Sequence, residues 1–255
     1  VERFARGDQR EKGHGPGPLV GEVGGRAFNM LSAANQPAKA NSLGLKMLAK
    51  GGIADKRLLR DVHRRMSNNY QQLQQFANAV ESLRKAQAIE ETADTQSSLI
   101  VLLSEARATP AEVEAAVNRY VQKWPEREDR YERQGYVARA YENAGDKAKA
   151  LAAYKALLSL DPAAHEAARR VVQLNGDEPA RLAETERLLL EAIQKFPRRA
   201  DYVTYVLATE LYDQRMKDRA RARKAVRERI AISKGDDQYA ASAAHWLLQT
   251  AADEA

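Results

Sequence analysis

Residues 131–162 read YERQGYVARAYENAGDKAKALAAYKALLSLDP, and this stretch decides the fold. It predicts two amphipathic helices joined by a turn at Gly145 and Asp146, because apolar and small residues recur at helical spacing on both sides of that turn. Ala150 places a small side chain where the helices would cross, and Pro162 cannot continue the second helix. One helix pair cannot bury its apolar face alone, so the stretch predicts stacked neighbours.

The pattern resembles a tetratricopeptide repeat, with Tyr141 late in the first helix, Ala150 at the crossing and Tyr154 one turn further on. The resemblance implies an all-α fold, a right-handed α-solenoid of stacked helix-turn-helix units. The family's first-helix tryptophan is missing, and its Leu-Gly pair is replaced by residues 137–138, Val-Ala. A generic helical bundle with accidental spacing is the alternative interpretation.

The organisation of the whole chain follows from sliding this pattern along its 255 residues. Residues 1–25 are rich in Gly and Pro and predict an extended arm, and residues 26–55 predict a helix pair. About five repeats follow in residues 56–235, and residues 236–255 predict a C-terminal capping helix. In the fifth repeat we expect the second helix to begin at Lys217, with Ala220 at the crossing.

The composition restricts the chemistry that the chain can perform. There is no cysteine, which excludes disulfides and thiolate chemistry, and the net charge of +6 is mild for this length. No apolar run reaches the length of a membrane-spanning helix, so we do not expect direct membrane insertion. The compartment, in the bacterial periplasm or in a cytoplasm, stays open.

Candidate catalytic and metal sites are missing from the sequence. The four histidines are scattered without zinc-ligand spacing, and the glycines of residues 13–17 follow no strand and precede no Gly-Lys-Ser/Thr motif. Carboxylates on the predicted helices alternate with Lys and Arg at i, i+4, as on a solvated face. We therefore expect no enzyme activity, no metal, no cofactor and no small-molecule substrate.

A tyrosine stripe is the first candidate binding surface. The resemblance implies that first helices line the concave wall through positions 2, 5, 9 and 12 of the repeat. In the fifth repeat these positions are Tyr202, Tyr205, Thr209 and Tyr212, and their spacing places them on one stripe of an α-helix. Tyrosine is favoured in protein interfaces. The alternative is that the C-terminal helix around Trp246 covers them.

A polar groove is the second candidate. Arg64 and Asn68 fall where carboxylate-binding members of the family place a basic residue and an asparagine, but Leu99 stands where their next asparagine would be. A complete clamp for a peptide terminus is therefore not expected. Arg139 and Asn143 could complete a groove with Arg64 and Asn68 that binds a backbone or an acidic side chain.

A basic stripe is the third candidate, formed by Arg219, Arg223 and Arg227 at i, i+4 spacing. Such a stripe could bind an acidic protein, anionic lipid or phosphate, but its ordinary interpretation is a solvated outer face. No aromatic side chains alternate with it, so nucleic acid is not expected.

Together these features predict a non-enzymatic scaffold or adaptor that binds a segment of a partner protein in the concave groove. Two alternatives remain. The chain could be a structural subunit of a larger assembly, for example one associated with the cell envelope or a membrane, or a regulatory repeat domain of a larger protein.

Overall fold

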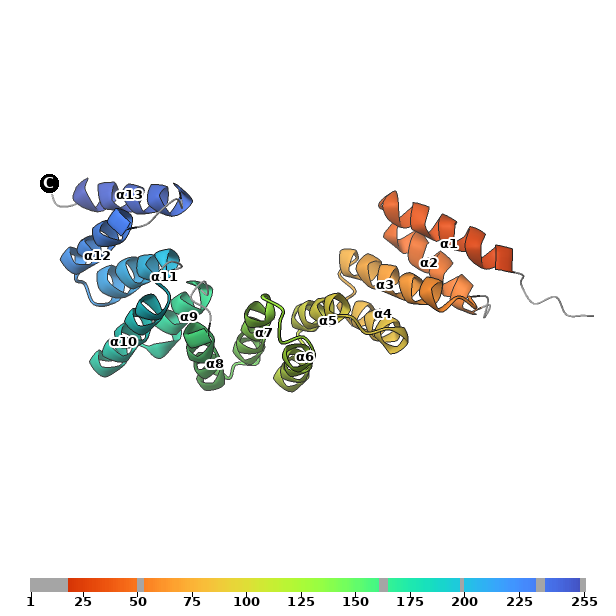
Figure 1. Ribbon diagram of the computed structural model, residues 1–255, viewed down its shortest axis with the longest axis horizontal. Helices are drawn as coiled ribbons and strands as arrows, with labels where there is room; N and C mark the ends of the chain where they lie inside the picture. Colours follow the sequence, from red (N-terminus) through yellow and green to blue (C-terminus); the bar gives the residue numbers. More distant parts are fainter. Residues whose placement is uncertain (1–17, 50–52, 161–164, 198–199, 233–236, 253–255) are drawn as a thin grey trace, which may run out of the picture. The chain divides into compact units, whose positions relative to one another are not determined.

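The computed structural model describes residues 18–49, 53–160, 165–197, 200–232 and 237–252. Within these ranges the chain forms thirteen α-helices, one of them continued by a π-helix, and no strand (Figure 1). The prediction of an all-α repeat fold is confirmed, while the handedness of the whole array stays a prediction. The chain divides into two compact units, residues 1–106 and 107–255, and each is described by itself.

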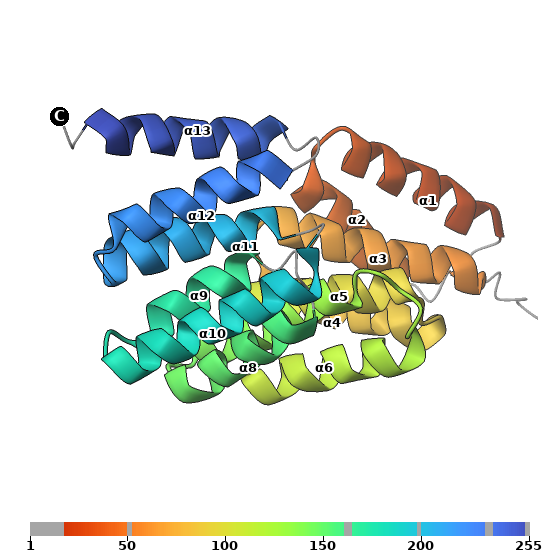
Figure 2. The same cartoon turned by 60° about the vertical axis from the view of Figure 1, so that its left-hand side comes forward.

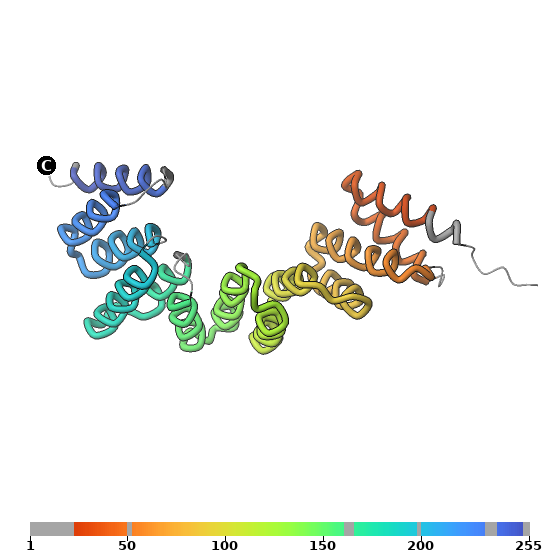
Figure 3. The backbone as a smooth tube through the Cα atoms, in the orientation of Figure 1, coloured from red at the N-terminus to blue at the C-terminus, as the bar shows by residue number. Residues whose placement is uncertain are grey.

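The first unit is a row of antiparallel helices in which each helix packs on the next, as the tube in Figure 3 traces. Its helices are α1 (Pro18–Ala33), α2 (Pro37–Ala49), α3 (Lys56–Gln72), α4 (Phe76–Ile89) and α5 (Ala93–Glu105). Positive-φ residues Asn35 and Gln74 close the turns after α1 and α3. The second of these helices, α2, begins at Pro37, because proline suits the first helical position.

The predicted extended arm does not include residues 18–25, which are helical. We expected an extended segment up to residue 25, but α1 begins at Pro18, and residues 1–17 lie outside the described residues. Gly24 and Gly25 face neighbouring helices instead of forming a linker. A Cβ at Gly25 would lie 3.1 Å from Leu58 Cδ1, and one at Gly24 would lie 3.3 Å from Met47 Sδ, so glycine permits close packing there.

The core of the first unit gathers apolar side chains of α1, α2 and α3 around Phe28, which is fully buried. A small polar network lies beside it. Asn69 donates to Asn41 Oδ1 at 3.0 Å and to Ser32 Oγ at 3.2 Å, which joins the same three helices. Buried polar groups of this kind must be paired, so the network constrains how α1 and α2 sit on α3.

The second unit is also a row of helices, and Figure 2 shows them stacked one beside the next from α8 to α13. The helices are α6 (Pro110–Lys123), α7 (Arg130–Asn143), α8 (Lys147–Leu160), α9 (His165–Asn175), α10 (Pro179–Lys195), α11 (Asp201–Val206), α12 (Arg219–Ile232) and α13 (Asp237–Ala252). A capping box of Thr109 and Glu112 starts α6, as its sequence suggests. The last helix, α13, packs on α11 and α12.

The fifth helix pair departs from the predicted register. α11 continues as the π-helix η2 (Leu207–Arg215), whose i→i+5 bonding accommodates an extra residue. Lys217 then adopts a positive φ of 58°, and α12 begins at Arg219, two residues later than expected. As a result Ala222 is fully buried at the helix crossing and Ala220 is exposed, so the prediction of Ala220 at this position was wrong.

Candidate functional site

A hollow at two of the predicted binding positions lies in the first unit, among α3, α4 and α5. Its volume is about 280 Å³, and eight side chains line it: Arg60, Arg64, Asn68, Leu83, Thr92, Asp94, Thr95 and Ser98. Two of the residues predicted for partner binding, Arg64 and Asn68, are among them. We refer to this hollow as the α3–α5 pocket.

The elements around the α3–α5 pocket are fixed by local sequence signals. Asp55 caps α3 by accepting from the backbone N–H of Arg57 at 2.8 Å. Ser67 ties α3 to α4, because its hydroxyl donates to the carbonyl oxygen of Ala79 at 2.8 Å. Thr92 and Thr95 form a reciprocal capping box at the start of α5. The pocket is therefore built from the ends and faces of well-anchored helices.

The two arginines of the α3–α5 pocket differ in their electrostatic state. Arg60 pairs with Asp61 at 3.0 Å and also with Glu90, and these hydrogen bonds raise the pKa of its guanidinium. Arg64 is exposed and forms no ion pair or hydrogen bond within the described part of the chain, and the same holds for Asn68 one turn later. A carboxylate could accept from Arg64, with the Asn68 amide and the Ser98 hydroxyl as further donors.

Sequence reasoning missed the residues across the α3–α5 pocket. Asp94 and Ser98 lie on α5 and face the predicted pair from the next repeat. The motif of Thr92 and Thr95 marks the start of α5 and could have indicated that this helix end borders the groove. Leu99, which stands where a clamp asparagine would be, is buried, with 7% of its surface exposed.

The tyrosine stripe of the second unit is not the exposed surface that we expected. Tyr202 is exposed at 37%, Tyr205 is partly buried, and Thr209 and Tyr212 are buried at 6% and 3%. The edges of the Tyr202 and Tyr205 rings meet the ring of Tyr239 on α13, with centroids 6.2 and 6.3 Å apart. The C-terminal helix thus covers part of the stripe through Tyr239.

The π-helix explains why the stripe breaks after Tyr205. The predicted spacing assumed 3.6 residues per turn, but the wider turn of η2 rotates Thr209 and Tyr212 towards the interior. The hydroxyl of Tyr212 donates to Glu186 Oε1 at 2.9 Å, and burial together with this bond raises the pKa of Tyr212 to about 12. Binding of a partner by these tyrosines remains a prediction.

The other polar pair, Arg139 and Asn143, lies on α7 in the second unit, so it belongs to a different compact unit from Arg64 and Asn68. Both residues are exposed, and the guanidinium of Arg139 lies 5.4 Å from the ring centroid of Tyr136. Glu142, on the same helix, begins a series of ion pairs that neutralises most of the nearby charge. The series runs Glu142–Arg170–Glu166–Arg169–Glu210.

The basic stripe on α12 is uneven. Arg219 pairs with Asp213 at 2.9 Å, Arg223 is partly buried, and Arg227 is exposed. The three residues therefore differ in their availability to an anionic partner, and their role remains a prediction.

The histidines whose side chains the structure describes do not form a common site. Burial and the nearby charge of Lys85 lower the pKa of the partly buried His63, and His245 is exposed on α13. His165 lies at the start of α9, and its side chain lies outside the described residues. Among the described side chains no cluster of three or more His, Asp or Glu could hold a metal ion. No helix in the described ranges has the length and apolar character to cross a membrane.

Comparison with known proteins agrees with the repeat pattern. The tetratricopeptide repeat family model matches residues 65–92 and 137–163, which lie in the first and the second unit respectively. The chain therefore contains tetratricopeptide repeats, as the resemblance implied. No curated protein matches the chain at a significant level.

Solved structures with TPR-like repeats show a distant similarity. Two crystal structures of nearly identical repeats from a Podospora anserina protein named as a kinesin light chain share 18% identity, cover 81% of this chain and 98% of their own, and give TM-scores of 0.42. The C-terminal part of a TPR repeat-containing protein from Cytophaga hutchinsonii shares 13% identity, with 84% and 97% coverage and a TM-score of 0.33.

Proposed function

We propose that this protein is a non-enzymatic adaptor that binds a segment of a partner protein through the α3–α5 pocket of its first unit. Tetratricopeptide repeats generally mediate protein–protein interactions, and the family generally consists of scaffolds without enzymatic activity. Asn68 lies inside the matched segment 65–92, and Arg64 immediately precedes it. The pocket therefore borders a recognised repeat.

One observation carries this proposal. Arg64 and Asn68 are exposed, line one hollow and have no hydrogen-bond partner among the described residues, whereas the neighbouring Arg60 is already neutralised by two carboxylates. A cation and an amide held one turn apart on a rigid helix suit an acidic side chain or a backbone segment of the partner.

The pocket alone gives a weak interaction. An exposed arginine–carboxylate pair is worth about 0–1 kcal/mol, so useful affinity requires further contacts along the partner segment. We expect the partner segment to be acidic, because Arg64, unlike Arg60, carries a positive charge that no carboxylate of the described residues neutralises.

Two matched double variants test the proposal, Arg64→Ala with Asn68→Ala on α3 and Arg139→Ala with Asn143→Ala on α7. Each removes an exposed Arg–Asn pair at i, i+4 spacing and leaves the buried core intact. Proteins captured from a native lysate by the wild type and both variants would be quantified by mass spectrometry, with folding checked by circular dichroism. We expect the α3 variant to lose a dominant partner and the α7 variant to retain most of it. Equal retention by all three proteins would contradict the proposal.

A structural subunit of a larger assembly is the second candidate, and exposed aliphatic side chains favour it. On α1 Val23 and Met30 are exposed at 65% and 72%, and on α13 Leu248 is exposed at 72%. Such side chains could be covered by fixed neighbours. Light scattering on the isolated chain separates the two functions, because an adaptor is expected to be a stable monomer and a subunit with uncovered faces to self-associate.

A further inference from the structure

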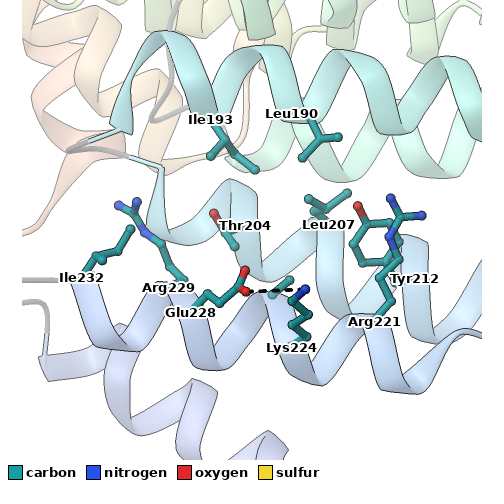
Figure 4. A pocket seen from close by; sticks show the side chains of 11 residues that line it. Leu190, Ile193, Thr204, Leu207, Tyr212, Arg221, Lys224, Glu228, Arg229 and Ile232 are labelled. Atoms are coloured by element: carbon teal, nitrogen blue, oxygen red, sulfur yellow. Dashed lines mark ion pairs between the residues drawn. The ribbon is translucent and has the colours of Figure 1, made fainter.

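A second hollow lies in the second unit, between α10 and α12, with α11 and η2 as its floor (Figure 4). Its volume is about 340 Å³. Leu190 and Ile193 line one wall, Leu207 lies in the floor, and Ala225 and Ile232 line the other wall. The side chain of Ile232 is exposed at 64%, so it is available to a partner at this end of the groove.

A buried arginine, Arg229, attaches α12 at one end of the groove. α10 packs directly on α8, whereas α12 packs mainly on η2. Arg229, exposed at only 6%, reaches from α12 to the carbonyl oxygen of Pro197 at 2.6 Å and to Asp201 Oδ1 at 2.5 Å. This pairing fixes one end of α12 against the start of α11 and so sets the position of the wall that α12 forms.

The helix that forms the second wall, α12, carries a net positive charge. Between Arg219 and Ile232 the helix α12 carries six Lys or Arg and a single Glu. Arg219, Arg221 and Arg229 are paired with carboxylates of the protein. Lys224 is exposed at 76% and lies 3.9 Å from Glu228, itself exposed at 67%, a surface pair of little strength (Figure 4). Arg227 is on the same helix but not among the residues that line the hollow; it is exposed and pairs with no carboxylate among the described residues.

We propose that the α10–α12 groove docks a short amphipathic segment of another protein, with aliphatic side chains entering the groove and acidic residues facing Lys224 and Arg227. The apolar walls supply burial for the aliphatic side chains, and the cationic edge selects the charge of the partner. α12 is about 21 Å long at 1.5 Å per residue, which suits a segment of a few helical turns or a short strand. The site is separate from the α3–α5 pocket, and its test is independent of the adaptor proposal.

The chain contains six isoleucines, which makes methyl NMR a direct test. Ile193 and Ile232 line the groove, Ile230 lies beside it, and Ile53, Ile89 and Ile100 belong to the first unit. The full-length protein, labelled at isoleucine methyls, would be titrated with a 16-residue amphipathic peptide of Leu, Ala and Glu. Two twins would serve as comparison, one with Lys in place of Glu and one with Ser in place of Leu.

We expect the acidic peptide to shift the signals of Ile193 and Ile232, leave the three isoleucines of the first unit unchanged, and bind at least about tenfold more tightly than either twin. Lys224→Glu and Ile232→Asp should each weaken binding, whereas Leu248→Asp, which changes an equally exposed aliphatic residue of the same unit, should not. Shifts confined to the first unit, no shifts, or equal binding of the serine twin would overturn the proposal. Equal binding of a short single-stranded oligonucleotide would show that the edge attracts polyanions in general and would overturn it as well.

Discussion

The helix pairs α7–α8 and α11/η2–α12 of the second unit are built to the same plan with different residues. In the first pair Gly145 turns the chain at φ 79°, and Asp146 caps α8 by accepting from Lys149 N at 3.0 Å. In the second pair Lys217 turns the chain at φ 58°, and Asp218 caps α12 by accepting from Arg221 N at 2.9 Å. The two turns therefore have a similar backbone conformation and the same type of cap, although the second has lysine where the first has glycine.

The correspondence extends to the packing around both turns. The hydroxyl of Tyr141 donates to Glu114 at 2.8 Å with Lys149 near its ring, and that of Tyr212 donates to Glu186 at 2.9 Å with Arg221 near its ring. The matched pairs are Glu114 and Glu186, Gly145 and Lys217, Lys149 and Arg221, Ala150 and Ala222, Leu157 and Arg229. Tyr212 is therefore the counterpart of the packing residue Tyr141 and not of a groove residue. The turn and cap set the register of α12, and η2 absorbs the extra length.

The largest expected effect comes from the position where the two pairs differ most, Leu157 in α8 and Arg229 in α12. Arg229→Ala should destabilise the protein by about 3–5 kcal/mol, because Asp201 is left partly buried without its partner. The double variant Arg229→Leu with Asp201→Ala makes α12 resemble α8, and it should recover most of that loss. Urea denaturation measures both. Arg227→Ala, at an exposed position of the same helix, is the control, and an equal loss there would contradict the role of the ion pair.

The register of α12 is tested by enlarging its alanines. Ala222→Leu should destabilise the protein by about 1–3 kcal/mol through overpacking at the helix crossing, as should Ala150→Leu in α8. Ala220→Leu should change stability by less than about 0.5 kcal/mol, since Ala220 is exposed. Thermal unfolding by circular dichroism distinguishes these outcomes. A large cost at Ala220 with none at Ala222 would restore the register predicted from the sequence, in which Ala220 lies at the helix crossing.

These alanines also show how much of the structure can be predicted from the sequence. The fold class, the α7–α8 turn and the crossing at Ala150 follow from helical periodicity and turn residues, which are local signals. A fixed spacing could not anticipate η2, because a π-helix leaves no strong mark in the sequence and is retained by tertiary packing. The cap motif was the usable signal, since Asp218, Arg221 and Ala222 repeat the order of Asp146, Lys149 and Ala150.

The candidate binding residues divide in the same way. Arg64 and Asn68 were predicted from one regular helix, α3, and they do line a common hollow. Tyr212 was assigned by counting through a segment that is not an α-helix, and it is buried. Asp94 and Ser98 come from the following helix, and no pattern within a single helix could place them opposite Arg64.

A third prediction concerns alkaline pH and the Tyr212–Glu186 bond. The folded-state pKa of Tyr212 is about 12, above the value near 10 of an unfolded tyrosine, so the neutral phenol stabilises the folded state. This contribution, on the order of 2 kcal/mol, is complete below pH 10 and is lost as the pH rises towards 12. The melting temperature should fall across that range less steeply in Tyr212→Phe than in the wild type. Parallel curves for the two proteins would show that Tyr212 does not carry the effect.

The smallest effect is expected at the turn itself, where exchanging the two residues tests whether the plans are equivalent. The left-handed backbone conformation of Lys217 costs free energy, whereas glycine adopts it without that cost. Lys217→Gly should therefore stabilise the protein by up to about 1 kcal/mol. Gly145→Lys should destabilise it by a similar amount for the same reason, since a Cβ at Gly145 meets no atom within 4 Å and only the backbone conformation opposes it. Chemical denaturation of both single variants measures the two changes. Opposite signs of comparable size would establish that the turns are interchangeable, whereas destabilisation by Lys217→Gly would show that the lysine side chain or the strain of η2 contributes to holding α12 in place.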